Sequence, residues 1–260
     1  MGAIADHSRS LKNMPEMTDA RTVRTASPWG PGGTGPLASS PVLTVVLEPG
    51  ECLYRAGERP SAGYVVKSGL LRQVMLLADG RRQIMRFIFP DDVLDWTDAA
   101  TMPVSAEAVE HAEVRCFSEA QLETVLGGNA TARANWQRLA EQHVHEMQRH
   151  AVVLGRLTSL ERLAYFLIWL RQHAAPSPDR MLHVPMVRGD IADYLGLTVE
   201  TVSRGLTILR DMGLIDLASS RHIRLKNPAA LRSLAGNILN VAASEETASA
   251  ASVDGYSLAS

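Results

Sequence analysis

The sequence predicts an α+β protein that combines a small antiparallel barrel, one long helix and a winged helix-turn-helix. Between Thr44 and Cys116, short apolar runs alternate with turn signals at the spacing of a small barrel. Residues 129–157 contain no proline and carry apolar side chains at three- and four-residue steps, which predicts a long amphipathic helix. Residues 188–206 contain two short amphipathic segments separated by Gly196, and a hairpin follows them.

Composition limits the class of protein. The 260 residues allow two domains, and a hydrophobic content of 46% is ordinary for a soluble protein. No apolar run approaches the length of a transmembrane helix, and the N-terminal residues lack the apolar core of a secretory signal. We therefore expect a cytoplasmic protein without a membrane partner. The net charge of −2 hides a positive excess in residues 158–240, which hold 10 Arg and Lys against 7 Asp and Glu.

Both ends of the chain have low-complexity composition. Residues 1–40 are rich in Gly, Pro, Ser and Thr, and residues 243–260 are mostly Ala and Ser. Such segments bury too little apolar surface to fold. We expect disordered segments at residues 1–40 and 241–260, without a function of their own.

The predicted barrel occupies residues 41–128. Asp79-Gly80 is its clearest hairpin signal, because Gly and Asp tolerate the positive φ of tight hairpin turns. Cys52 and Cys116 both fall in this region. In a reducing cytoplasm we expect both to be small buried apolar residues.

The predicted long helix spans residues 129–157. Its stripe is longer than either neighbouring domain needs, so we expect a partner along it. His143 and His150 lie near one face, but no further Cys or His stands at ligand spacing, and polar residues in a dimer seam often fix register. The predicted seam consists of Trp136, Leu139, His143, Met147, His150, Leu154 and Leu157.

Residues 158–240 are predicted to form the third unit. A helix over residues 160–173 is followed by a short strand over residues 182–184 and then by the helix-turn-helix. The apolar runs 214–217 and 223–225 form a hairpin, the wing.

Within the helix-turn-helix, Gly196 can take the left-handed conformation that ends the first helix, and Thr198 caps the second. Gly205 lies inside the second helix, where it costs about 1 kcal/mol relative to Ala but permits a neighbouring element to approach closely. The predicted buried stripes are Ile191 and Leu195 on the first helix, and Val199, Val202, Leu206 and Leu209 on the second.

Three polar residues share one face near the start of the second helix: Glu200, Ser203 and Arg204. Arg can bond guanine O6 and N7 together, Glu can accept from cytosine N4, and Ser can bond a base or a phosphate. We expect this face to read bases in the major groove of double-stranded DNA; the alternative is a helical hairpin whose polar face is only solvated. The expected contacts to the DNA backbone are Arg188, Thr198, Thr201, Arg221, His222 and Arg224.

The segment 185–227, PMVRGDIADYLGLTVETVSRGLTILRDMGLIDLASSRHIRLKN, resembles the DNA-binding end of the Crp/Fnr family of bacterial transcription regulators. Its E-T-V-S-R core is most similar to the Fnr and FixK branch, in which the Glu, Ser and Arg of this motif read a TTGAT half-site. Val199 stands where the cyclic-AMP-responsive branch usually carries Arg. The resemblance therefore implies that Glu200, Ser203 and Arg204 read a TTGAT-type palindrome.

Residues 49–57, PGECLYRAG, and 64–69, YVVKSG, resemble the β-roll of the cyclic-nucleotide-binding fold. Members that bind cyclic AMP use a Gly-Glu pair and a nearby Arg; the matching stretch 91–96 lacks the pair, and no Arg or Lys occurs between Arg86 and Arg115. Fnr itself holds an iron–sulfur cluster with four Cys, whereas this chain has two. We therefore expect no cofactor, and FixK-like proteins are the closer comparison.

The resemblance also implies a homodimer paired through the long helix, an activator that recruits RNA polymerase, and control of low-oxygen, respiratory or nitrogen-metabolism genes. A regulator gated by a small molecule or haem in the roll is the alternative. An enzyme is not expected, because the sequence offers no nucleophile with a neighbouring base, no Gly-rich phosphate loop and no metal-spaced cluster.

Overall fold

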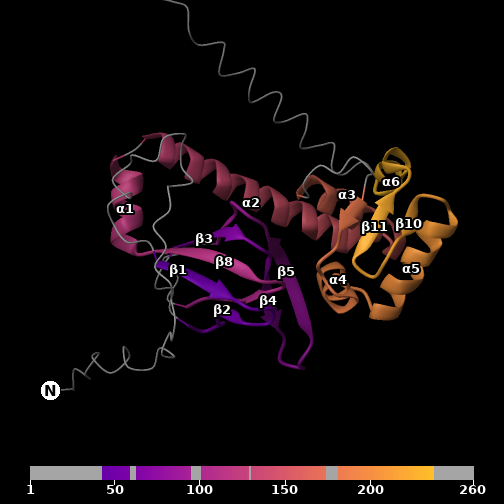
Figure 1. Cartoon of the computed structure of the whole chain (residues 1–260), viewed down its shortest axis with the longest axis horizontal. Coiled ribbons are helices and arrows are strands. Elements are labelled where there is room, and N and C mark those ends of the chain that lie inside the picture. The colour runs from indigo at the N-terminus through magenta and orange to yellow at the C-terminus, as the bar shows by residue number, and fades with distance from the viewer. Residues whose placement is uncertain (1–42, 59–62, 95–100, 129, 174–180, 237–260) are drawn as a thin grey trace, which may run out of the picture.

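The computed structural model describes residues 43–58, 63–94, 101–128, 130–173 and 181–236 (Figure 1). The segments predicted to be disordered, and residues 95–96 of the stretch compared with the cyclic-AMP-binding motif, lie outside these residues. Of the helices within them, none has both the length and the apolar character needed to cross a membrane.

The first half is a β-roll of two facing four-stranded antiparallel sheets, as predicted. Apolar side chains from both sheets fill the space between them, including Tyr64, Leu71 and Val114. One sheet has the order β1 (Leu43–Leu47), β8 (Ala112–Phe117), β3 (Gly63–Ser68) and β6 (Val93–Leu94). The other has the order β2 (Cys52–Tyr54), β7 (Ser105–Ala108), β4 (Leu71–Leu76) and β5 (Arg82–Ile88).

The hairpin signal Asp79-Gly80 joins β4 to β5, as predicted. Gly80 has φ 85°, and the Leu77 amide donates to the Arg81 carbonyl oxygen at 2.8 Å. The two cysteines lie in different sheets; Cys116 is buried, but Cys52 is only partly buried, which corrects the expectation for that residue. Burial raises the pKa of the Cys116 thiol to about 12, so this thiol is protonated at neutral pH.

Two helices follow the roll: α1 (Glu119–Gly128), which the sequence analysis did not predict, and α2 (Ala130–Arg156). The bounds of α2 agree closely with the predicted long helix. In Figure 1, α2 runs along the roll from α1 to the C-terminal unit. One helix therefore contacts both halves of the protein.

The C-terminal unit has the predicted helix-turn-helix and wing. The wing is a three-stranded antiparallel sheet, because the strand predicted near residue 182 pairs with the second strand of the hairpin. Its helices are α3 (Ser159–His173), α4 (Arg188–Leu195), α5 (Val199–Asp211) and α6 (Pro228–Leu234), of which α6 was not predicted. Its strands, in the order of the sheet, are β10 (Ile215–Leu217), β11 (His222–Leu225) and β9 (Met181–His183).

The roll and the C-terminal unit share one apolar core, which the sequence analysis did not predict. The outer face of β4 and β5 contributes Val74 and Phe87 to the cluster that contains most of α3 and the buried side of α4. The Phe87 ring lies 5.2 Å from Tyr194 of α4 and 6.3 Å from Trp169 of α3, centroid to centroid. The C-terminal unit is therefore packed against the roll of the same chain.

Gly205 is the point at which α5 crosses α3. A Cβ atom at this position would lie 2.3 Å from Cδ1 of Leu163, a residue that is 1% exposed. The structure thus supplies the close neighbour that the sequence analysis expected, and a larger residue at this position would have to displace Leu163.

We predict that Gly205→Ala lowers the free energy of unfolding by about 1 kcal/mol, because overpacking costs about 1–3 kcal/mol and the gain in helix propensity offsets about 1 kcal/mol of it. Denaturant titration followed by circular dichroism measures the change. Gly189→Ala is the matched control, since a Cβ at that helical position meets nothing within 4 Å, and it should leave stability equal or higher. A Gly205→Ala protein more stable than wild type would contradict the tight crossing.

Candidate nucleic-acid interface

The turn between α4 and α5 has the geometry that its sequence predicts. Gly196 adopts the left-handed conformation, with φ 60°, and its amide donates to the carbonyl oxygen of Ala192. Thr198 is the N-cap of α5, and its hydroxyl oxygen accepts from the Thr201 amide at 3.2 Å. These local contacts fix the direction in which α5 leaves α4.

The buried side of the helix-turn-helix matches the prediction except at Val199. Val199 is 44% exposed, because it is the first residue of α5 and precedes the part of the helix that packs on the core. The exposed position agrees with the sequence observation that this residue stands where a related branch has an Arg. The predicted residues that are buried are Ile191, Leu195, Val202, Leu206 and Leu209.

The proposed base-reading residues Glu200, Ser203 and Arg204 are all exposed on the side of α5 opposite its buried stripe. Hydrogen bonds from its own backbone amide and from Thr198, together with the nearby Arg204 charge, hold the pKa of Glu200 below its ordinary value. At neutral pH this face therefore presents a carboxylate acceptor, a hydroxyl and a guanidinium donor. In Figure 1, α5 lies at the end of the molecule remote from the roll.

The candidates for phosphate contact fall into two groups. Arg221, His222 and Arg224 are exposed on the wing, within reach of a ligand. Thr198 and Thr201 instead bond each other at the helix cap, so DNA would meet their backbone amides and hydroxyls as part of the cap.

Arg188, at the start of α4, differs from the wing residues because its guanidinium is half-buried. Burial lowers the pKa of Arg188, and its Nη1 atom is buried without a hydrogen-bond partner in the described part of the chain. Buried donors usually have a partner. Because this atom is shielded from solvent, DNA would have to displace its neighbours to reach it, and the phosphate contact at Arg188 stays a prediction.

Most of the predicted seam of α2 is half-buried against the same chain, and its role in a dimer stays a prediction. Trp136, Leu139 and His143 lie toward the roll, and His150 is buried with its ring stacked 4.2 Å from that of Tyr194. Leu154 and Leu157 pack near the C-terminal unit. Of the seven predicted residues, only Met147 lies on the outer side, with 50% exposure.

The outer side of α2 carries a second apolar stripe. Val144 and Met147 are each 50% exposed, and Ala151 continues the stripe at heptad spacing from Val144. Around the axis of α2, the directions of the two stripes differ by roughly a quarter turn. The spacing of apolar residues in the sequence was therefore not enough to distinguish one stripe from the other. The inner stripe serves the fold, and the outer one remains available.

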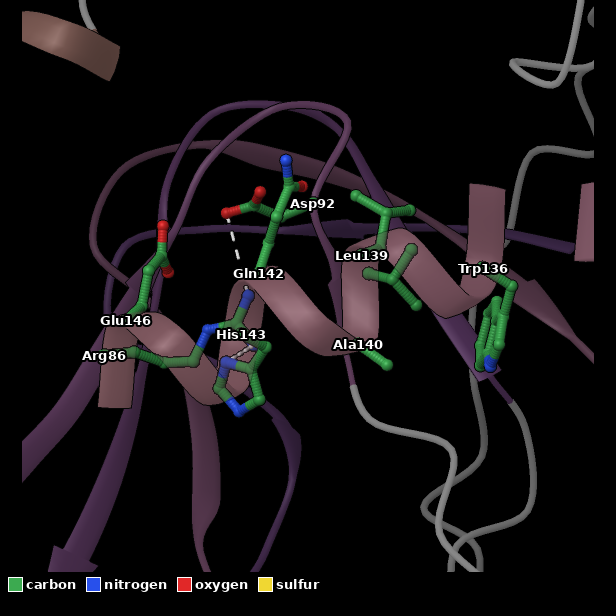
Figure 2. A pocket seen from close by; sticks show the side chains of 9 residues that line it. Arg86, Asp92, Trp136, Leu139, Ala140, Gln142, His143 and Glu146 are labelled. Carbon is green, nitrogen blue, oxygen red and sulfur yellow. Dashed lines mark hydrogen bonds and ion pairs between the residues drawn. The ribbon is translucent and has the colours of Figure 1, made fainter. Parts of the chain in front are cut away.

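A cavity of about 120 Å³ lies between α2 and the roll (Figure 2). Its cation, Arg86, already contacts His143 Nδ1 at 2.8 Å and the Asp92 carboxylate at 3.7 Å. Burial raises the pKa of Glu146, a third ionisable group of the lining. The cavity is smaller than the roughly 300–1,000 Å³ of pockets for drug-sized ligands, and its Arg is already matched by acidic neighbours.

His143 and His150, which raised the question of a metal or haem, have separate partners. His143 contacts Arg86 and His150 stacks on Tyr194. Over the ranges that the structure describes, no group of three or more His, Cys, Asp or Glu side chains is arranged to hold a metal ion.

Two segments of the chain match family models: residues 44–129 match the cyclic nucleotide-binding domain, and residues 161–234 match the Crp-like helix-turn-helix domain. The nitrogen fixation regulation protein FixK of Rhizobium meliloti is 35% identical over 202 residues, 78% of this chain and 91% of that protein. The transcriptional activator protein Anr of Pseudomonas aeruginosa is 32% identical over 197 residues, 74% of this chain and 80% of that protein. The structure of FixK2 from Bradyrhizobium japonicum aligns at 33% identity with a TM-score of 0.70, covering 74% of this chain and 96% of that one.

The buried His150 makes stability depend on pH. Burial, aided by the Arg162 charge, lowers the pKa of His150 to about 4. The unfolded chain therefore takes up the proton first as the pH falls. We predict that the free energy of unfolding decreases between about pH 6.5 and pH 4, by at most about 3 kcal/mol from this group, and that this contribution does not change further below pH 4.

Denaturant titrations at several pH values test this. His150→Phe, which keeps a ring against Tyr194, should flatten the slope in that range, whereas His145→Phe, at an exposed position of the same helix, should leave it unchanged. Equal slopes in wild type and His150→Phe would show that other groups cause the pH dependence.

Proposed function

The chain belongs to the FixK-like branch of the Crp/Fnr family of transcription regulators, and from this premise we propose that it binds TTGAT-type palindromes as a homodimer. The observation that carries the proposal is the exposed face of α5, on which Glu200, Ser203 and Arg204 stand together. These residue types match the hydrogen-bonding groups of base pairs in the major groove. The relatives are transcription regulators rather than enzymes.

Phosphate contacts complete the proposed interface. Arg188, Thr198 and Thr201 border the reading face at the two helix starts, and Arg221, His222 and Arg224 extend it along the wing. Contacts of this kind give affinity and register without sequence information. Arg188 is included for its positive charge and its place at the start of α4.

We propose that the outer stripe of α2 forms the dimer seam. Val144, Met147 and Ala151 repeat at the spacing of a coiled coil, and a second copy of the chain would cover these exposed side chains. A two-fold axis along α2 presents two recognition helices, which a palindromic site matches. This seam shares Met147 with the stripe predicted from the sequence, whose other members are half-buried or buried in the single chain.

In the resulting division of the chain, the roll (residues 41–128) and the long helix (residues 129–157) hold the DNA-binding unit (residues 158–240) on a promoter. FixK of Rhizobium meliloti is named for the regulation of nitrogen fixation, and Anr is named a transcriptional activator. We propose a corresponding role here: a cytoplasmic activator that recruits RNA polymerase at genes of low-oxygen, respiratory or nitrogen metabolism. The small volume of the cavity beside α2 favours activity without a cyclic nucleotide over gating by such an effector.

Fluorescence anisotropy of the purified protein without added ligand tests the proposal. At fixed physiological salt, a TTGAT/ATCAA palindrome should bind more tightly than a scrambled duplex of equal length. Equal affinity for the two duplexes would reject the proposed half-site.

We predict that Arg204→Ala costs about 1–3 kcal/mol at the guanine of each half-site and leaves non-specific affinity nearly intact, because a bidentate base contact is lost. Competition between the palindrome and single-base variants measures it. Arg210→Ala is the control, since Arg210 lies at the far end of α5 and bonds Asp211 at 2.8 Å. An equal loss on every sequence would make Arg204 a phosphate contact.

We predict that Met147→Glu converts the dimer into monomers, because it places two carboxylates against each other at the two-fold axis. Sedimentation equilibrium should report the monomer mass, and affinity for the palindrome should fall toward that for one half-site. His145→Glu adds the same charge at an exposed position outside the stripe and should remain dimeric. A dimeric Met147→Glu protein would exclude this seam.

A further inference from the structure

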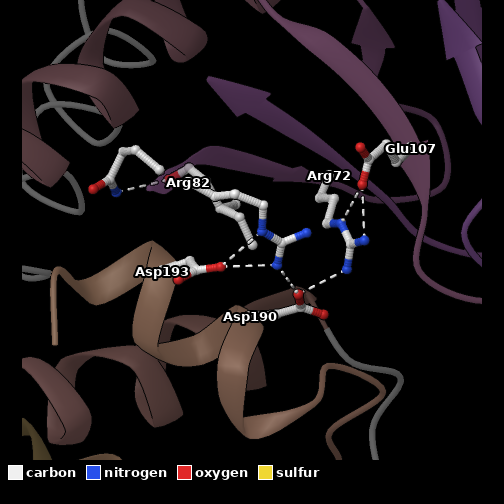
Figure 3. A network of polar contacts seen from close by, with 7 residues as sticks. Arg72, Arg82, Glu107, Asp190 and Asp193 are labelled. Atoms are coloured by element: carbon white, nitrogen blue, oxygen red, sulfur yellow. Dashed lines mark hydrogen bonds and ion pairs between the residues drawn. The ribbon is translucent and has the colours of Figure 1, made fainter. Parts of the chain in front are cut away.

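An ion network joins the roll to the first helix of the DNA-binding unit (Figure 3). Asp190, in the first turn of α4, is 2% exposed and receives hydrogen bonds from two arginines of the roll. Arg72 Nη1 of β4 donates to Asp190 Oδ1 at 2.7 Å, and Arg82 Nη2 of β5 donates to the same oxygen at 3.2 Å. The carboxylate is thus shared between neighbouring strands.

A second layer of contacts fixes each arginine. Glu107 of β7 accepts from Arg72 Nε at 3.0 Å and from Nη2 at 2.8 Å, which holds that guanidinium in one orientation. Arg82 also donates to Asp193 Oδ2, one turn further along α4, at 2.8 Å from Nη2. Gln83, the neighbour of Arg82 on β5, donates from Nε2 to the Tyr194 carbonyl oxygen at 3.3 Å. The network therefore contacts α4 at three positions, Asp190, Asp193 and Tyr194.

The network is costly to open. A buried carboxylate that loses its cations keeps its desolvation penalty, so separating α4 from the roll would leave Asp190 uncompensated. The same movement would expose the face of Phe87 that packs on Tyr194. Polar and apolar contacts thus resist the same displacement.

The direction of the recognition helix depends on this attachment. Gly196 and Thr198 fix α5 relative to α4, and α4 is fixed to the roll. The roll in turn packs on α2, whose outer stripe forms the proposed dimer seam. The network is therefore one link in the path from the two-fold axis to the base-reading face.

We propose that Arg72, Arg82, Asp190 and Asp193 are positioning residues that set the spacing between the half-sites this regulator accepts. The inference rests on the proposed function, a dimer that binds a palindrome. With α4 attached, the two reading faces lie at one separation; with α4 released, each DNA-binding unit pivots at the end of α2. A released dimer tolerates several spacings and loses the affinity that comes from simultaneous engagement of both half-sites.

The main variant changes only the roll, so that any effect of it on DNA recognition must pass through the interface. Arg72→Gln/Arg82→Gln removes both cations from Asp190 and Asp193 and leaves residues 158–240 unaltered. Lys67→Gln/Arg81→Gln is the matched control: it removes two positive charges from the same roll, and their partners Glu113 and Asp79 also belong to the roll. The control corrects for the weaker long-range attraction of DNA.

Affinity is measured by anisotropy on the palindrome, on palindromes with one or two base pairs inserted between the half-sites, and on a single half-site. For Arg72→Gln/Arg82→Gln we expect about tenfold weaker binding to the palindrome, reduced discrimination between spacings, and unchanged half-site affinity. Asp193→Asn, which weakens only the outer pair, should change the same quantities in the same direction by about two- to threefold.

The outcomes separate the alternatives. Equal losses on palindrome and half-site would mean that the arginines act on the fold of the DNA-binding unit, and the proposal would be wrong. Spacing discrimination identical to that of the control would also overturn it. A wild-type protein that binds the palindrome no better than a scrambled duplex would reject the proposed function itself, and the spacing role with it.

Discussion

The attachment of α4 to the outer face of β4 and β5 determines how the parts of this protein are placed. Asp190 carries a charge into a site that is 2% exposed, and it does so because Arg72 and Arg82 bond it from two adjacent strands. Beside it, Phe87 packs on Tyr194 and Trp169. The buried charge selects one arrangement and the aromatic contacts supply apolar burial, so the roll and the DNA-binding unit share a core instead of meeting only through a linker.

The α2 helix has an inner and an outer apolar stripe with different roles. Its inner stripe completes the fold of one chain: Leu139 lies toward the roll and His150 stacks on the first helix of the helix-turn-helix. Its outer stripe, centred on Val144 and Met147, has no partner of comparable character among the described residues. A helix with two such faces can transmit the geometry of a dimer axis to the units packed on it, since it contacts both.

The helix-turn-helix separates the residues that read DNA from those that hold the fold. Gly205 lets α5 cross α3 so closely that a Cβ atom at this position would lie 2.3 Å from Cδ1 of Leu163. One residue earlier, Arg204 points to the opposite, exposed side. Substitutions on the exposed face can therefore change specificity with little effect on the core, whereas those on the buried face act through stability.

The sequence by itself determined what depends on neighbours a few residues apart. The left-handed Gly196, the Thr198 cap, the Asp79-Gly80 hairpin and the shared face of Glu200, Ser203 and Arg204 all follow from local backbone preferences and helical spacing. Tertiary structure alone decided which stripe of α2 faces inward, that Val199 is exposed, that β9 joins the wing, and that Arg72 meets Asp190 across 118 residues of chain. Helical periodicity indicates that a face is apolar, but it does not indicate which surface covers that face. An ion pair between distant residues has no characteristic spacing in the sequence, because its geometry exists only once the sheets and helices have packed.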